Sequence, residues 1–426
     1  MPAPTTPMPH FGRRRLFAGA LGLGAIAGLS ACGGTSSSGG DTSTVTVGSY
    51  QSDEIPKKAF AEMMAGFSGA QVKINTIQHE AFKESINNYL QGSPDDVFTW
   101  FAGYRARYFA QKGLVGDISD VWQKIDGMPE SMKSASSTTD GKQIFVPSTY
   151  YPWAVFYRPS VFAERGYTAP KTLNEWISLN EKMKADGLTP IAFADKDGWE
   201  AMGTFDMLNL RVNGYDFHVS LMAGQEAWDG EKVKKVFSTW KELLPFHEEA
   251  ALGRTWQEAA QGLLQKKSGV YLIGMFMQQQ FANTDAKDDL DFFVFPEVDS
   301  AIGADVVEAP VDGFMMAAKP KNPTVAKELL LYLSSPAAVN ITVKADPSVI
   351  AANSKADSSG YNALQKKAVK VVEEAKHISQ FLDRDSRPDF ASTVVGPALQ
   401  QFIKEPASID SVLKNVEDQK KSIFAS

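Results

Sequence analysis

The segment from residue 44 to residue 100 alternates between two hydrophobic periods, and this alternation limits the folds open to the chain. "TVTVGSY" (44–50), "AQVKINTI" (70–77) and "DDVFTW" (95–100) are typical of β-strands. Between these segments, apolar residues fall at helical spacing in two groups: Phe60, Met63, Met64 and Phe67, then Phe82, Ile86, Tyr89 and Leu90. A β-α-β-α-β order predicts a parallel sheet covered by helices. The fold class is therefore expected to be α/β.

The loops that follow these three strands are the first candidates for a binding site. Ligands on helix-covered parallel sheets usually bind at loops leaving the carboxyl ends of the strands. Here those loops are residues 50–54, 78–80 and 100–107.

Helical patterns dominate from about residue 171 onward. Thr172 with Glu175, and Thr255 with Glu258, match the capping box that begins a helix. Two short strands are expected at 269–273 and 291–296, and a final helix at 409–423.

The first 43 residues have the pattern of an export signal followed by a tether. Three arginines (13–15) precede an uncharged, mostly apolar stretch (16–31), and small residues lead to Cys32, the only cysteine. The adjacent arginines before Leu16-Phe17 suggest the twin-arginine route. Residues 29–32, Leu-Ser-Ala-Cys, are similar to the bacterial lipobox, in which the cysteine is lipidated. We therefore expect a signal at 1–31 and a flexible, lipid-anchored tether at 32–43.

The remaining chain is long and acidic. Residues 32–426 exceed the usual size of one core and suggest two domains. The chain carries 43 basic and 50 acidic residues, and removing the arginine-bearing signal makes it more acidic. A nucleic-acid partner is not expected, because such binding needs a basic face.

The sequence contains few catalytic motifs. The five histidines are scattered, and neither a phosphate-binding loop nor a G-x-S-x-G motif is present. "DKDG" at 195–198 lacks the rest of a calcium loop, so an acidic turn is the better interpretation. No cofactor or metal is expected. A tethered glycoside hydrolase stays an alternative, because its two carboxylates need only meet in space.

Aromatic residues are concentrated in two passages, 97–109 and 148–158. Strand alternation can bury about half of them in sheet and core. Trp100, Tyr104, Tyr151 and Trp153 lie at breaks in the pattern and are predicted to be binding platforms. Aromatic faces beside Asp, Glu and Arg suit sugars, which offer C–H surfaces for stacking and hydroxyls for hydrogen bonds.

Five segments carry a resemblance to a known family. They are residues 92–122, 146–176, 203–217, 309–320 and 381–390. The order Pro-Asp, aromatic cluster, Gly-Leu, Tyr-Arg strand and "PKTLNEW" resembles the extracellular solute-binding proteins of bacterial ABC transporters. Within them it is similar to the carbohydrate-binding group with maltodextrin- and multiple-sugar-binding lipoproteins.

The resemblance implies a periplasmic-binding-protein-like fold, with two α/β lobes joined by a multi-strand hinge and a ligand cleft between them. Chain crossings are expected near 148–153, 310–314 and 347–351. Lobe one would comprise residues 44–150 and 311–350. Lobe two would comprise residues 151–310 and 351–426.

The resemblance also implies a set of sugar-binding residues. They are Gln51, Asp53, Trp100, Tyr104, Arg105, Tyr151, Trp153, Trp199, Asp206, Asp312, Arg384 and Asp385.

By the same resemblance the chain is the substrate-binding component of a sugar importer and not an enzyme. A disaccharide or oligosaccharide would close the hinge, and the closed form would dock on a separate permease driven by a cytoplasmic ATPase. The receptor would be a monomer on the outer face of the cell membrane, held there by its lipid alone. Two other ligands stay open: ferric iron, because Tyr150-Tyr151 is similar to an iron-ligating pair, and a polyamine.

Overall fold

The structure is a computed structural model and describes residues 43–425. The predicted signal, Cys32 and nearly all of the tether lie outside the described residues. Within residues 43–425 no helix is long and apolar enough to span a membrane.

The first sheet contains the β-α-β-α-β unit predicted from the sequence. Its order is β11-β4-β10-β3-β1-β2, with β1 parallel to both β2 and β3, and β10 antiparallel to β3 and β4. The strands are β1 (Thr44–Ser49), β2 (Gln71–Thr76), β3 (Val97–Phe101), β4 (Val146–Tyr150), β10 (Val311–Met316) and β11 (Ile350–Ala351). The intervening helices are α1 (Glu54–Ala65) and α2 (His79–Gln91). The predicted parallel arrangement is confirmed for β1, β2 and β3, while β10 and its antiparallel pairings make the whole sheet mixed.

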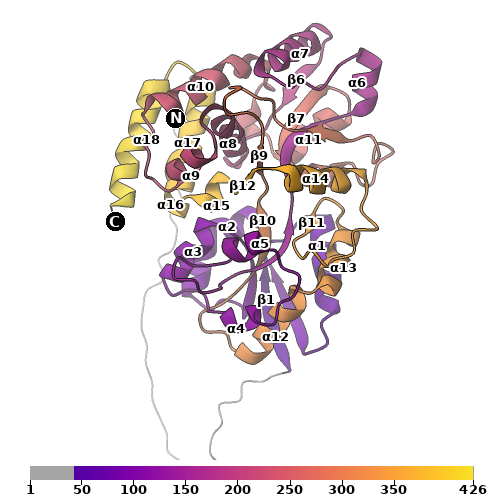
Figure 1. Cartoon of the computed structure of the whole chain (residues 1–426), viewed down its shortest axis with the longest axis vertical. Helices are drawn as coiled ribbons and strands as arrows, with labels where there is room; N and C mark the ends of the chain where they lie inside the picture. Colours follow the sequence, from indigo (N-terminus) through magenta and orange to yellow (C-terminus); the bar gives the residue numbers. More distant parts are fainter. Residues whose placement is uncertain (1–42, 426) are drawn as a thin grey trace, which may run out of the picture. The chain divides into compact units, whose positions relative to one another are not determined.

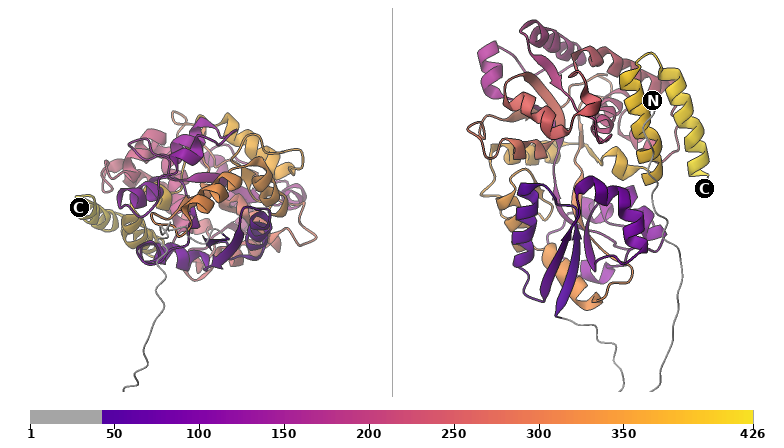
Figure 2. Two further views of the ribbon diagram at one scale, coloured as in Figure 1. Left: turned by 90° about the horizontal axis from the view of Figure 1, so that it is seen from below. Right: turned by 180° about the vertical axis from the view of Figure 1, so that it is seen from behind.

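A second sheet forms the centre of the other lobe (Figure 1). Its order is β6-β7-β5-β8, and a separate parallel pair joins β12 to β9. The strands are β5 (Trp153–Tyr157), β6 (Thr189–Ala192), β7 (Ser268–Gly274), β8 (Asp291–Phe293), β9 (Val306–Glu308) and β12 (His377–Ser379). Seen from behind (Figure 2, right), the indigo N-terminal strands lie in one lobe and the yellow C-terminal helices in the other. The predicted two-lobe α/β fold is confirmed.

The remaining helices surround these sheets. In the first half of the chain they are α3 (Tyr104–Gln111), α4 (Ser119–Trp122), α5 (Glu130–Ala135), α6 (Pro159–Arg165), α7 (Leu173–Ala185), α8 (Glu200–Asn213) and α9 (Tyr215–Met222). Later come α10 (Glu231–Leu243), α11 (Trp256–Leu264), α12 (Pro323–Leu333), α13 (Pro336–Ala345), α14 (Ala363–Glu374), α15 (Leu382–Asp385), α16 (Pro388–Phe390), α17 (Gly396–Lys404) and α18 (Ile409–Phe424). Short turns are η1 (Leu244–Phe246), η2 (Ala251–Gly253), η3 (Met275–Gln280) and η4 (Ala391–Val395).

The chain passes between the sheets at the first predicted crossing. Residues 151–152 connect β4 of the first sheet directly to β5 of the second. At the second crossing β10 enters the first sheet after β9, and at the third the chain leaves the first sheet after β11 and continues into α14, which packs with the second sheet. The cavity described below lies at these passages.

Two local predictions need correction. At α7, Thr172 accepts from the Glu175 N–H at 3.3 Å, but the Glu175 carboxylate accepts from Lys171 N rather than from Thr172 N. The box is therefore only half formed there, whereas at α11 both bonds of the Thr255–Glu258 box are present. Strand β8 ends at Phe293 rather than at Pro296, whose nitrogen has no hydrogen to donate to a neighbouring strand.

Apolar residues cover both faces of the first sheet. Val45, Val47 and Phe60 belong to one cluster, and Phe98 and Trp100 to another on the opposite side. All five residues of β3 are buried, because β1 and β10 flank the strand and clusters cover both faces. A buried central strand has no face left for exposed aromatic platforms.

Candidate functional site

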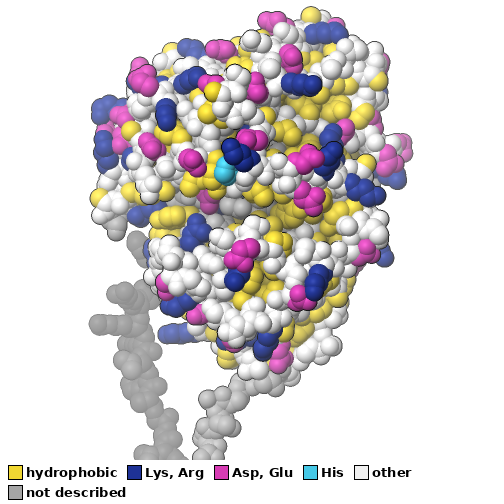
Figure 3. Space-filling model, in the orientation of Figure 1, with side chains coloured by type: hydrophobic (Ala, Val, Ile, Leu, Met, Phe, Trp, Pro, Cys, Tyr) yellow, Lys and Arg dark blue, Asp and Glu magenta, His cyan; other side chains and the backbone are white. Residues whose placement is uncertain are grey.

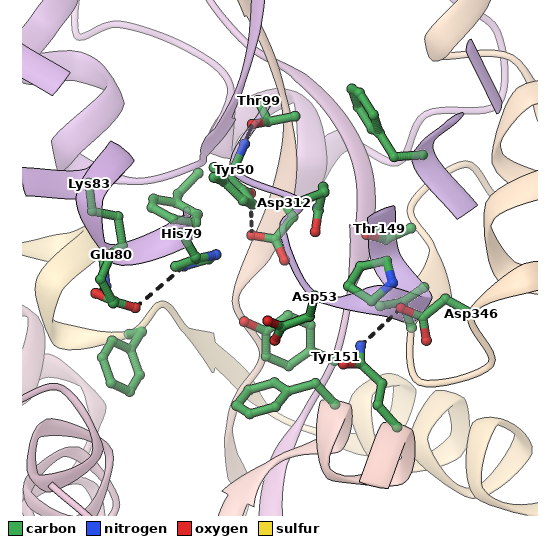
Figure 4. A pocket seen from close by; sticks show the side chains of 18 of the residues that line it. Tyr50, Asp53, His79, Glu80, Lys83, Thr99, Thr149, Tyr151, Asp312 and Asp346 are labelled. Atoms are coloured by element: carbon green, nitrogen blue, oxygen red, sulfur yellow. Dashed lines mark hydrogen bonds and ion pairs between the residues drawn. The ribbon is translucent and has the colours of Figure 1, made fainter. Parts of the chain in front are cut away.

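A cavity of about 410 Å³ lies between the two sheets. Its walls include loops after β1 and β2, the crossing between β4 and β5, the start of β10, and helices of the second lobe. Figure 4 shows Tyr50, Asp53, Tyr151 and Asp312 pointing into its centre. All three segments predicted to bind ligand therefore contribute to the cavity wall: 50–54, 78–80 and, through Phe101, 100–107.

Arg384, at the end of α15, organises the centre of the cavity. Its guanidinium donates to Asp312 Oδ1 at 3.0 Å and to the Tyr151 hydroxyl at 3.0 Å. The same group lies 4.1 Å from the centre of the Phe101 ring, in a cation–π contact. Tyr50 donates to Asp312 from the other side at 3.2 Å. These contacts hold five side chains from separate parts of the chain in one network.

Asp383 forms a second network at one end of the cavity. Its carboxylate lies 3.1 Å from Lys83 Nζ and 3.4 Å from Arg105 Nη1. Burial would raise the pKa of Asp383, but Lys83 and Arg105 outweigh burial and lower it. Lys83 also lies 3.2 Å from Glu80. Because α2 and α3 pack beside the first sheet, this network joins them to α15.

Aromatic rings form the wall on the side of the second sheet. Trp153 packs against Phe381 with ring centres 5.0 Å apart, and against Trp199 at 6.2 Å in a T-shaped pair. Phe276 contacts Tyr151 at 5.5 Å and Trp256 at 5.0 Å. All of these residues line the cavity. The arrangement offers flat apolar faces beside hydrogen-bonding groups.

Protonation states in the cavity follow from burial. Burial lowers the pKa of His79 to about 4, so the imidazole is neutral at pH 7 and its 3.9 Å approach to Glu80 is not an ion pair. Burial raises the pKa of Asp312, although Arg384 opposes the effect. Burial also raises the pKa of Asp53, while a hydrogen bond from Gln257 lowers it.

Seven of the twelve sequence-predicted residues line the cavity. They are Gln51, Asp53, Tyr151, Trp153, Trp199, Asp312 and Arg384. They come from both lobes and the crossing.

The other five lie behind the cavity wall. Trp100 is fully buried in β3, and Arg105 packs 5.1 Å from its ring while pairing with Asp383. Asp206 accepts from Leu382 N at 2.7 Å and so holds the start of α15. Asp385 accepts from the backbone N–H of Tyr104, at the first turn of α3. These residues support the wall, and their assignment as direct ligand contacts stays a prediction.

Sequence reasoning missed several lining residues. Tyr50 and His79 lie in loops that were singled out, but neither side chain was chosen. Phe276, Gln279 and Asp346 had no local signal, because their role depends on elements far apart in sequence. The cluster around Asp383 was missed for the same reason.

The comparisons with known proteins agree with this architecture. The sequence profile of the family "Bacterial extracellular solute-binding protein" matches residues 49–340. The chain is 44% identical to the solved structure of the bacterial solute receptor AcbH, with a TM-score of 0.87, covering 90% of this chain and all of that one. That receptor is described as having an exclusive substrate preference for β-D-galactopyranose.

Curated relatives are more distant and match over part of their length. An "Uncharacterized ABC transporter extracellular-binding protein" of Pyrococcus horikoshii is 24% identical over 66% of this chain and 63% of its own length. A "Probable sugar-binding periplasmic protein" of Mesorhizobium japonicum is 24% identical over 47% of this chain and 49% of its own length. The resemblance deduced from the sequence is confirmed: the chain belongs to the bacterial extracellular solute-binding proteins.

Proposed function

We propose that this protein is the sugar receptor of an ABC importer and that the sugar binds in the cavity around Arg384. The observation that carries the proposal is the pairing of an aromatic wall, Trp153, Trp199 and Phe276, with the polar network of Arg384 and Asp312. Sugar rings stack on aromatic faces, and their hydroxyls replace the water that these buried polar groups lose. The similarity to a galactose receptor makes galactose the first sugar to test.

The charges of the cavity favour a neutral sugar over an anionic one. Three lining carboxylates, Asp53, Asp197 and Asp346, have no ion pair among the described residues. A sugar acid or sugar phosphate would meet these charges at close range in a partly desolvated site. Hydroxyl groups would instead donate hydrogen bonds to them.

The adjacent tyrosines do not support an iron site. Tyr151 lines the cavity, and its hydroxyl accepts from Arg384. The preceding residue, Tyr150, does not line the cavity and packs among apolar residues. The two phenol groups therefore do not converge on one point.

The proposed mechanism is closure of the two lobes around the sugar. Cavity residues come from both sheets, so a bound sugar contacts both lobes only in the closed form. That difference in contact is what shifts the population toward closure. The closed form would then be recognised by a separate permease with its ATPase, and no chemistry on the sugar is proposed.

The organisation of the whole chain is part of the same proposal. Cleavage before Cys32 and lipidation there would keep the receptor beside its permease, with export by the twin-arginine route, and the receptor would act as a monomer. We also keep the lobe boundaries 44–150 with 311–350, and 151–310 with 351–426. These boundaries are supported by the strands β1 to β4 and β10, which all belong to the first sheet, and by Ile350, with which β11 of the same sheet begins.

A thermal-shift screen of the chain from Gly33 onward tests the function. A ligand that binds only the folded state raises the melting temperature. We expect a rise with galactose or another neutral sugar, none with galacturonate, and no product after incubation with oligosaccharides. A rise with spermidine or ferric citrate but with no sugar would contradict the sugar assignment, and released product would favour the glycoside hydrolase.

A further inference from the structure

Besides the Arg384–Asp312 pair at its centre, two direct contacts join the lobes at the ends of the cavity. In the first, Gln279 of η3 donates to Asp346 Oδ2 at 3.0 Å and to Ser348 Oγ at 3.1 Å. Gln279 follows β7 of the second sheet, whereas Asp346 and Ser348 lie between α13 and β11 of the first. In the second contact, Asp383 pairs with Lys83 and Arg105. We name these the amide bridge and the ionic bridge.

The two bridges lie at opposite ends of the cavity. Figure 4 shows Lys83 and Glu80 at one side and Asp346 at the other, with Asp53, Tyr151 and Asp312 between them. Gln279, Asp346, Lys83 and Asp383 all line the cavity. The bridges therefore bound the space in which a sugar can lie.

The two acceptors of the amide bridge, Asp346 and Ser348, are buried and hydrogen-bonded to each other. Asp346 is 3% exposed and Ser348 is 1% exposed. Asp346 Oδ1 accepts from the Ser348 N–H at 3.0 Å and also from the Ser348 hydroxyl. Gln279 thus supplies the one contact to Asp346 Oδ2 that crosses between the lobes.

We propose that the amide bridge of Gln279 sets the upper limit of ligand length, so that the receptor takes one or two sugar rings and rejects longer chains. The inference rests on the proposed sugar-binding function and narrows its substrate class. It also narrows the prediction from sequence, which included oligosaccharides in general.

The physical reason is the cost of opening an end of the cavity. A sugar chain longer than the space between the two bridges would have to displace the Gln279 amide and leave the buried acceptors Asp346 and Ser348 without their donor. The ionic bridge is harder to open, because separating buried charges leaves each of them unpaired. The uncharged amide bridge is therefore the end at which length is decided.

The test compares sugar length in wild type and in Gln279→Ala. Two series are titrated by calorimetry: the monomer, dimer and trimer of β-1,4-linked galactose, and the same lengths of α-1,4-linked glucose. In wild type we expect the trimer of the accepted series to bind at least about tenfold more weakly than the monomer. In Gln279→Ala we expect the ratio of trimer to monomer dissociation constants to fall about tenfold.

Gln280→Ala is the matched control. Gln280 is the next residue of η3, does not line the cavity, and accepts from Gln261 at 3.3 Å within the same lobe. Its removal should leave the length ratio unchanged. A variant that merely loosens the fold would weaken all three lengths together, and the ratio would not move.

The outcomes separate the two proposals. Equal binding of monomer and trimer by wild type, or an unchanged ratio in Gln279→Ala, overturns the length limit while the sugar function stands. Binding of no sugar in either series, together with a flat thermal-shift screen against sugars, overturns the proposed function and the length limit with it.

Discussion

Arg384 is the residue on which the centre of the site depends. Its planar guanidinium donates hydrogen bonds to Asp312 and Tyr151 and at the same time packs against the Phe101 ring, which a compact ammonium group cannot do. We predict that Arg384→Lys weakens sugar binding by about 2 kcal/mol or more, because the lysine ammonium keeps the charge but cannot contact Asp312, Tyr151 and the Phe101 ring together. Calorimetry measures the loss. Arg387→Lys, whose guanidinium pairs with Asp389 away from the cavity, should bind as wild type does.

The ring of Trp153 packs directly against the backbone of Gly203, where a side chain would leave it no room. A Cβ at residue 203 would lie 2.2 Å from Cζ3 and 2.5 Å from Cη2 of Trp153, well inside contact distance. We predict that Gly203→Ala displaces this ring, changes the near-ultraviolet circular dichroism and lowers sugar affinity. Gly253→Ala, where a Cβ meets nothing within 4 Å, is the control. Unchanged affinity in Gly203→Ala would show that Trp153 is not a sugar platform.

At the scale of elements, two buried carboxyls lie at the start of α8, next in sequence to the cavity residues Lys196, Asp197 and Trp199. Glu200 is the first residue of the helix, and Asp195 in the preceding loop accepts from the Ala201 N–H at 2.8 Å. Burial raises the pKa of Asp195 to about 7 and that of Glu200 to about 9. Unfolded carboxyls ionise near pH 4, so the neutral forms stabilise the fold fully below that pH. This stabilisation is lost as the pH rises through the folded values.

The replacement Glu200→Gln tests this element. In wild type, each carboxyl that is neutral in the folded state lowers the free energy of unfolding by about 1.4 kcal/mol per pH unit as the pH rises toward its folded pKa. We predict that between pH 7 and pH 9 the free energy of unfolding falls less steeply in the variant than in wild type. Urea unfolding at several pH values measures the slope. Equal slopes in the variant and wild type would mean that Glu200 is ionised in the fold, and the exposed Glu181→Gln should match wild type.

At the scale of the molecule, charge is spread rather than concentrated. On the face shown in Figure 3, basic and acidic side chains are interspersed. This distribution fits the expectation from composition that the partner is not a nucleic acid. The proposed place of recognition is instead the cavity, where Arg384 pairs with Asp312 and Asp383 with Lys83.

Closure of the lobes is the prediction that belongs to this scale. The amide and ionic bridges exist only while Gln279 faces Asp346 and Asp383 faces Lys83, so opening the lobes breaks both. We predict that saturating sugar lowers the radius of gyration measured by small-angle X-ray scattering. An identical radius with and without sugar would contradict hinge closure. The same measurement on Arg384→Lys should show a smaller change at equal sugar concentration.

The sequence by itself determined three strands of the first sheet, β1, β2 and β3, and the two helices between them, because hydrophobic period acts over a few neighbouring residues. It also indicated the family and three segments that contribute to the cavity wall. It could not separate Trp100, buried in β3, from Trp153, which lines the cavity, since both stand in similar aromatic passages. Whether an aromatic side chain is core or platform depends on which strands flank it.

Only the tertiary structure decided which distant residues meet. Three contacts join residues far apart in the sequence, which no local pattern can predict. They are Asp383 with Lys83, Arg384 with Asp312, and Gln279 with Asp346. These contacts arise from the crossings of the chain between two sheets, and the crossings follow from packing of whole elements. The site is therefore a property of the two lobes together, whereas the strands and helices that carry it are properties of the local sequence.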